Sequence, residues 1–125
     1  MYRLGVKRQF SAAHKLEGHP GRCSRLHGHT WTVEAVLRST RLGPDGLVVD
    51  FEDLETALDD AIDPFDHEYL NEVPPFDGIA PTAENVARAI FDRLNIAVEG
   101  SSWRAELESV TVWESGEARA SFSIE

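Results

Sequence analysis

The fold is decided by residues 2–14, YRLGVKRQFSAAH, in which apolar and polar side chains alternate. Most even-numbered positions are apolar, and the residues there that share one face are Tyr2, Leu4, Val6, Phe10, Ala12 and His14. A period of two places successive side chains on opposite faces of a strand. The stretch therefore predicts a half-buried strand. Arg8 occupies an apolar position of this pattern, and we expect an interruption there, such as a β-bulge.

Three further stretches alternate in the same way. Residues 29–38 place Trp31, Val33, Ala35 and Leu37 on one face. Near the other end of the chain, Val110, Val112 and Glu114 share a face, and so do Ala118, Ala120, Phe122 and Ile124. Each stretch predicts a strand, and the last two are joined by a turn.

Two amphipathic helices are predicted between the strand pairs. The first begins after the N-cap Asp50 and ends at Pro64, with an apolar stripe formed by Leu54, Ala57, Leu58, Ala61 and Ile62. The second begins after Thr82, and its stripe is Ala83, Val86, Ala87, Ile90 and Leu94. The order β-β-α-α-β-β favours an α+β fold, a four-stranded antiparallel sheet with two helices on one face. Residues 1–125 fit one domain.

Composition and charge limit the class of protein. No stretch approaches the roughly 20 apolar residues that cross a bilayer, and no secretory signal precedes the first strand, so we expect a cytoplasmic protein without membrane contact. The net charge of −10 argues against nucleic acid as a partner. Residues 1–41 nevertheless hold eight Lys/Arg and two Asp/Glu. This basic third is either a site for a small anion or a solvated surface.

Three histidines are candidate metal ligands. His27 and His29 are two residues apart at the start of a predicted strand, so both imidazoles lie on one face. His14 ends the first strand and arrives beside them if the two strands pair. Three imidazoles with an open fourth position are typical of catalytic Zn²⁺. The alternative is that these histidines are hydrogen-bonded residues at strand ends.

The single cysteine, Cys23, cannot form an internal disulfide. Arg22 and Arg25 flank it, and positive neighbours favour the thiolate, which is the useful base or nucleophile. Cys23 could instead be a metal ligand, although a fourth protein ligand would close the site. It could also be a small buried apolar residue.

Two acidic positions complete the set of candidates. Asp66 precedes His67, and a carboxylate beside an imidazole can orient it for acid–base chemistry; the alternative is a histidine at a helix end near an acidic surface. Glu114 continues the apolar face of Val110 and Val112. Either it binds a ligand that offers several N–H donors, or the strand has emerged into solvent.

Six short motifs in this order resemble the family of 6-pyruvoyltetrahydropterin synthases and 6-carboxytetrahydropterin synthases. They are Phe10-Ser11-Ala12-Ala13-His14, Cys23-x-x-x-His27-Gly28-His29, Val49-Asp50-Phe51-x-x-Leu54, Asp66-His67-x-x-Leu70-Asn71, Pro81-Thr82-Ala83-Glu84-Asn85 and Val112-Trp113-Glu114-Ser115. The resemblance covers nearly the whole chain. Ser115 stands where the family often has threonine, and both side chains carry a hydroxyl.

The resemblance implies a role for each candidate. His14, His27 and His29 match the zinc ligands, Cys23 matches the catalytic base, and Asp66 and His67 match the pair that assists it. Glu114 matches the glutamate that anchors the pterin ring. Thr82 and Glu84 lie in the segment that lines the neighbouring subunit's pocket, and Lys15, Arg22 and Arg25 are our candidates for the triphosphate.

The resemblance also implies a reaction and an assembly. The substrate of the family is 7,8-dihydroneopterin triphosphate. The short chain favours the lyase that forms 6-carboxy-5,6,7,8-tetrahydropterin, acetaldehyde and triphosphate for 7-deazaguanine (queuosine) biosynthesis. Alternatives are a 6-pyruvoyltetrahydropterin synthase that only eliminates triphosphate, a pterin enzyme acting on dihydroneopterin without its triphosphate, and a non-catalytic zinc-binding assembly protein. Three sheets of this tunnelling fold join into a barrel, and two trimers stack into a homohexamer.

Overall fold

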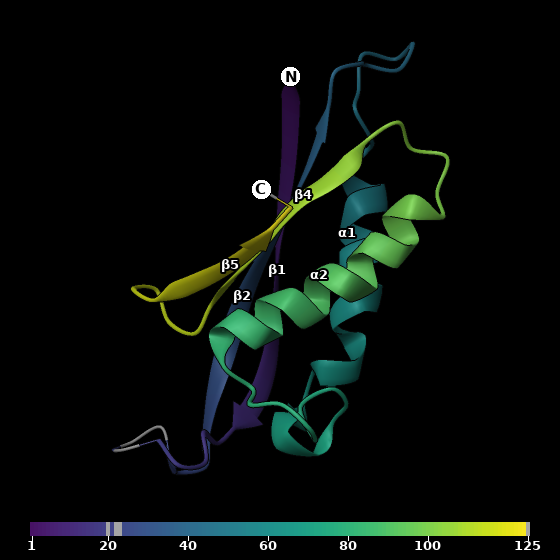
Figure 1. The fold of residues 1–125 in the computed structure, drawn as a ribbon. Coiled ribbons are helices and arrows are strands. Elements are labelled where there is room, and N and C mark those ends of the chain that lie inside the picture. Colours follow the sequence, from purple (N-terminus) through teal and green to yellow (C-terminus); the bar gives the residue numbers. More distant parts are fainter. Residues whose placement is uncertain (20, 22–23, 125) are drawn as a thin grey trace.

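A computed structural model describes residues 1–19, 21 and 24–124 and shows two helices on one face of a sheet (Figure 1). The strands are β1 (Tyr2–His14), β2 (His27–Ser39), β3 (Glu68–Tyr69), β4 (Glu106–Trp113) and β5 (Arg119–Ser123). The helices are α1 (Phe51–Ile62) and α2 (Ala83–Glu99), and short 3₁₀ turns cover Asp63–Phe65 and Leu70–Glu72. No helix of the described residues is both long and apolar enough to cross a membrane.

The sheet has the strand order β3-β1-β2-β4-β5. Its four longer strands pair antiparallel, and with the two helices they confirm the α+β class. The predicted count of four is one too low, because β3 adds a short parallel pairing to β1 at Ala12↔Glu68 and Ala13↔Tyr69. Two residues are too few to show a period in the sequence. This pairing depends on how the segment after α1 docks against β1.

The prediction of an interruption at Arg8 is wrong. β1 pairs with β2 without a break from Tyr2↔Ser39 to His14↔His27. Arg8 stays on the helix-facing side, where its Nη2 lies 2.9 Å from Asp59 Oδ2 and its Nη1 lies 3.5 Å from Glu55 Oε2. The two acidic residues of α1 thus neutralise an inward charge without a change of register. The register shift occurs in the pairing of β2 with β4, between Val36 and Leu37.

Both helices begin where the sequence predicts, and α1 ends close to the predicted Pro64. The Asp50 side chain accepts a hydrogen bond from the N–H of Glu52 at 2.9 Å, and the Thr82 hydroxyl accepts one from the N–H of Asn85 at 3.2 Å. These caps satisfy N–H groups that a first helical turn leaves free. The α1 helix ends at Ile62, two residues before Pro64.

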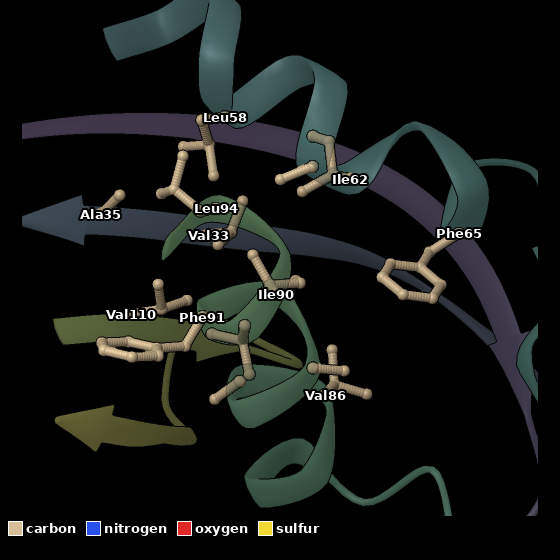
Figure 2. Close-up of a cluster of buried hydrophobic side chains, with 14 of the residues drawn as sticks. Val33, Ala35, Leu58, Ile62, Phe65, Val86, Ile90, Phe91, Leu94 and Val110 are labelled. Atoms are coloured by element: carbon tan, nitrogen blue, oxygen red, sulfur yellow. The ribbon is translucent and has the colours of Figure 1, made fainter. Parts of the chain in front are cut away.

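The core lies between the sheet and the two helices (Figure 2). Leu58 of α1 and Ile90 and Leu94 of α2 are fully buried against Val33 of β2. Burial along β2 alternates strictly from Trp31 to Ser39, so the odd-numbered residues face the helices. His27 and His29 have the same parity, which places them on the helix side at the start of β2.

Candidate metal centre

Three histidines meet at one end of the sheet, where β1 ends and β2 begins. His14 and His27 are direct partners in the β1–β2 pairing, and His29 lies opposite Ala12. One nitrogen of each imidazole can be chosen so that all three lie within 4.8 Å of one another. The predicted proximity is confirmed, and it follows from strand pairing and a period of two.

Backbone carbonyls orient two of the three rings. His14 Nδ1 lies 2.8 Å from the carbonyl oxygen of Pro81, and His27 Nδ1 lies 2.6 Å from that of Arg25. Because a carbonyl oxygen only accepts, each Nδ1 must carry the proton. In the neutral form of each ring, Nε2 then presents a lone pair. This is the arrangement of metal-binding histidines, whose second nitrogen donates to a carbonyl or carboxylate.

Two of these Nε2 atoms lack a hydrogen bond within the described part of the chain. His14 Nε2 and His29 Nε2 are buried and make no hydrogen bond to any residue that the structure describes. Burial lowers the pKa of His14 and of His29 below the ordinary value, which favours the neutral imidazoles that bind metal. Buried unpaired acceptors cost free energy, and a cation at this point would satisfy them. The donor set therefore fits Zn²⁺ or a similar transition metal.

Trp31 and Glu114 border the three imidazoles. The Trp31 ring is fully buried, and its centroid lies 5.1 Å from that of His14 and 5.6 Å from that of His29. Glu114 follows the last residue of β4, and its Oε1 lies 3.8 Å from His14 Nε2. The Glu114 side chain remains 28% exposed. A carboxylate thus stands at the mouth of the cluster, and its negative charge opposes the lowering of the His14 pKa by burial.

Asp66 and His67 form a separate pair on the edge of β1. His67 Nδ1 lies 2.9 Å from Asp66 Oδ1, and that oxygen accepts a hydrogen bond from the N–H of Ser11 at 3.0 Å. His67 has a φ of 61°, uncommon for a residue other than glycine, and its side chain is 81% exposed. It lines an open hollow together with Ser11, Thr30 and part of His29. Asp66 thus orients His67, which faces solvent in the single chain.

The family model described as 6-pyruvoyl tetrahydropterin synthase matches residues 3–125. The chain belongs to this family. A 6-carboxy-5,6,7,8-tetrahydropterin synthase of Synechocystis is 39% identical over 93 residues, which cover 70% of each chain. The enzyme of that name from Haemophilus influenzae is 29% identical, over 91% of this chain and 93% of its own.

Solved structures of the synthase family share the fold. The 6-pyruvoyl tetrahydropterin synthase of Caenorhabditis elegans superimposes with a TM-score of 0.82 at 27% identity, covering 100% of this chain and 98% of its own. A Plasmodium vivax 6-pyruvoyl tetrahydropterin synthase gives a TM-score of 0.75 at 21% identity, over 97% of this chain and 96% of its own. Membership of the family indicates a lyase-type activity.

The remaining predicted site residues of this synthase-family member lie around the histidine end. Thr82 caps α2 directly after Pro81, and Glu84 is exposed in the first turn of α2. Lys15 follows β1 and is half-buried, whereas Arg25 is exposed. The predictions for Cys23 and Arg22 lie outside the described residues.

Several residues that support the cluster are not evident from the sequence. The carbonyl groups of Pro81 and Arg25 orient two imidazoles, and any residue type could supply them. Trp31 forms a wall of the cluster, although its position in the alternation predicts only a core residue. Asn71 contacts the backbone next to His14. In the sequence, Asn71 is only part of a family motif and has no predicted role.

Proposed function

We propose that the chain is a zinc-dependent lyase that converts 7,8-dihydroneopterin triphosphate to 6-carboxy-5,6,7,8-tetrahydropterin, acetaldehyde and triphosphate. The observation that carries the proposal is the meeting of three imidazoles, two of which have buried Nε2 atoms that make no hydrogen bond to a described residue. The curated relatives named 6-carboxy-5,6,7,8-tetrahydropterin synthase support the choice of product. The reaction takes up water, because the new carboxyl group holds one oxygen more than the side-chain carbon from which it forms.

In this proposal His14, His27 and His29 hold the metal and leave a position open for substrate. A zinc ion there would act as a Lewis acid on the side-chain hydroxyls of the substrate and so acidify neighbouring C–H and O–H bonds. The Cys23 thiolate removes a carbon-bound proton. His67 takes up that proton from Cys23, and Asp66 keeps the imidazole oriented, as its 2.9 Å contact supports.

Other residues bind the two ends of the substrate. Glu114 accepts paired hydrogen bonds from the aminopyrimidine edge of the pterin, and its partly exposed carboxylate beside His14 suits that role. Lys15, Arg22 and Arg25 are assigned to the triphosphate because they cluster in the basic third of the sequence. Thr82 and Glu84 are assigned to the wall of a neighbouring subunit's pocket.

The proposal includes a homo-oligomer, a hexamer built from two trimers. β3 covers the outer edge of β1 only at Ala12 and Ala13, and β5 forms the opposite edge of the sheet. Closing three sheets into a ring would pair these edges. It would also explain why Asp66 and His67 face solvent, since they would complete the site of a neighbour. The cytoplasmic location stays a prediction.

The test is to incubate the zinc-loaded protein with 7,8-dihydroneopterin triphosphate and to identify the products by mass. We expect 6-carboxytetrahydropterin with acetaldehyde and triphosphate in equal amounts. A pyruvoyl product without acetaldehyde would assign the alternative elimination reaction. Turnover of dihydroneopterin itself would indicate a different pterin enzyme. A hexamer that holds zinc but turns over neither compound would favour the non-catalytic assembly protein.

A further inference from the structure

A short segment after α1 runs along the outer edge of β1 towards the metal centre. The N–H of His67 donates to the carbonyl oxygen of Ser11 at 2.6 Å, and the Ser11 N–H donates to Asp66 Oδ1. The β3 strand then pairs with Ala12 and Ala13. The outer edge of β1 is therefore occupied near the end of the strand, from Ser11 onwards.

Asn71 continues this contact beyond the end of β1. The Lys15 N–H donates to Asn71 Oδ1 at 2.9 Å, and Asn71 Nδ2 donates to the Lys15 carbonyl oxygen at 2.8 Å. One side-chain amide thus binds both backbone groups of one residue, as a neighbouring strand would. The amide is held in place because Leu70, the residue before it, is fully buried in the core.

The residue that Asn71 holds is the one directly after His14. His14 is the last residue of β1, where it pairs with His27 of β2. Without the amide, the Lys15 backbone would lose two half-buried hydrogen bonds, and the end of β1 at His14 would be held less firmly. A small rotation there would move the imidazole relative to His27 and His29.

We propose that Asn71 is a positioning residue for the metal centre, which fixes the Lys15 backbone and thereby aims the His14 imidazole at the ion. This inference rests on the proposed zinc-dependent function. It also makes one segment responsible for both parts of the site, because Asp66 and His67 lie in the same segment as Asn71. The docking of this segment against β1 then fixes both the direction of the His14 imidazole and the position of His67.

The test compares Asn71→Ala with the full-length wild-type protein. Zinc affinity is measured by competition with a chelator, and ligand geometry is measured by the visible absorption of the Co²⁺-loaded protein. We expect zinc to bind up to about tenfold more weakly, the lower end of the loss caused by removing a direct partner of a metal ligand, because Asn71 acts on His14 through the Lys15 backbone. The Co²⁺ bands should also shift. Asn95→Ala is the matched control, because the Asn95 side chain donates a hydrogen bond to Glu99 at the exposed surface of α2. This variant should change neither the zinc affinity nor the Co²⁺ spectrum.

A second variant separates the hydrogen bonds from packing. Asn71→Asp keeps the size of the side chain, but one carboxylate oxygen faces the Lys15 carbonyl oxygen, so we expect weaker zinc binding here too. If Asn71→Ala does not fold, the zinc affinity and the Co²⁺ spectrum of Asn71→Asp test the role of Asn71. Wild-type affinity and an unchanged Co²⁺ spectrum in the folded variants would overturn the role of Asn71. A wild-type protein that binds no zinc would instead contradict the proposed function.

Discussion

The Nδ1 atom of His14 lies 2.8 Å from the carbonyl oxygen of Pro81, so the last residue of β1 is tied to the residue that leads into α2. These two residues are far apart in sequence, and Thr82, the cap of α2, follows Pro81 directly. The helix start and the strand end therefore hold one imidazole between them. Its Nε2 is directed to the point where His27 and His29 also arrive.

The first prediction concerns the metal ligands. His27→Ala should lower zinc from about one ion per chain to nearly none and should abolish turnover, because two imidazoles bind zinc far more weakly than three. Zinc is measured by elemental analysis after dialysis. His19→Ala is the control, since His19 is not part of the three-histidine cluster, and it should keep its zinc. Full zinc in His27→Ala would remove the ligand assignment.

The second prediction separates the base from the metal. Cys23→Ala should keep about one zinc per chain and should lower the rate of product formation at least about 100-fold, the usual contribution of a general base. Zinc content and product formation are measured on the same sample. Loss of zinc together with activity would show that the sulfur is a ligand rather than a base.

The third prediction tests whether the site is shared between subunits. Cys23→Ala and His67→Ala should each be inactive, but mixed hexamers refolded from both should regain activity. In a random mixture about a quarter of the sites would combine an intact Cys23 with an intact His67 from a neighbour. Activity is measured before and after mixing. A mixture as inactive as its parents would place both residues in one subunit.

Strand and helix patterns predicted most of the fold and the centre of the site. The alternation in β1 and β2 was enough to bring His14, His27 and His29 together, because pairing and period fix which residues share a face. The uninterrupted course of β1 past Arg8 could not be derived. It depends on the ion pair between Arg8 and Asp59, and the sequence does not show how the helix that carries Asp59 packs.

The support of the site was also beyond sequence reasoning. The carbonyl groups that orient His14 and His27 belong to the backbone and carry no side-chain signal. The separation of His67 from the imidazole cluster depends on the path of the segment along β1. Such features arise from tertiary docking, which is not encoded in a local period.

The fourth prediction concerns pH. Burial lowers the pKa of His14 and of His29 in the folded chain below the ordinary 6.5. Below about pH 6.5 the unfolded metal-free chain therefore binds more protons than the folded one, and the free energy of unfolding falls as the pH is lowered. The contribution is fully present above that pH. Zinc should be released over the same range, since protons compete for the imidazoles.

The measurement is urea unfolding of the metal-free protein at about pH 7.5 and about pH 5.5. A variant with both His14→Gln and His29→Gln is the control, and its stability should change less between the two conditions. Equal pH dependence in the variant and in the wild type would assign the effect to other groups.

The last prediction concerns Glu114. Glu114→Gln should raise KM for the pterin substrate about 10- to 100-fold, because a neutral amide replaces a carboxylate that accepts charge-assisted hydrogen bonds. Zinc content should stay near that of the wild type, since Glu114 lies beside His14 rather than within the three-histidine group. Steady-state kinetics and elemental analysis check the two parts separately. Glu106→Gln at the other end of β4 is the matched control, because its carboxylate pairs with Arg38 and should leave KM unchanged. An unchanged KM and rate in Glu114→Gln would contradict the anchoring role.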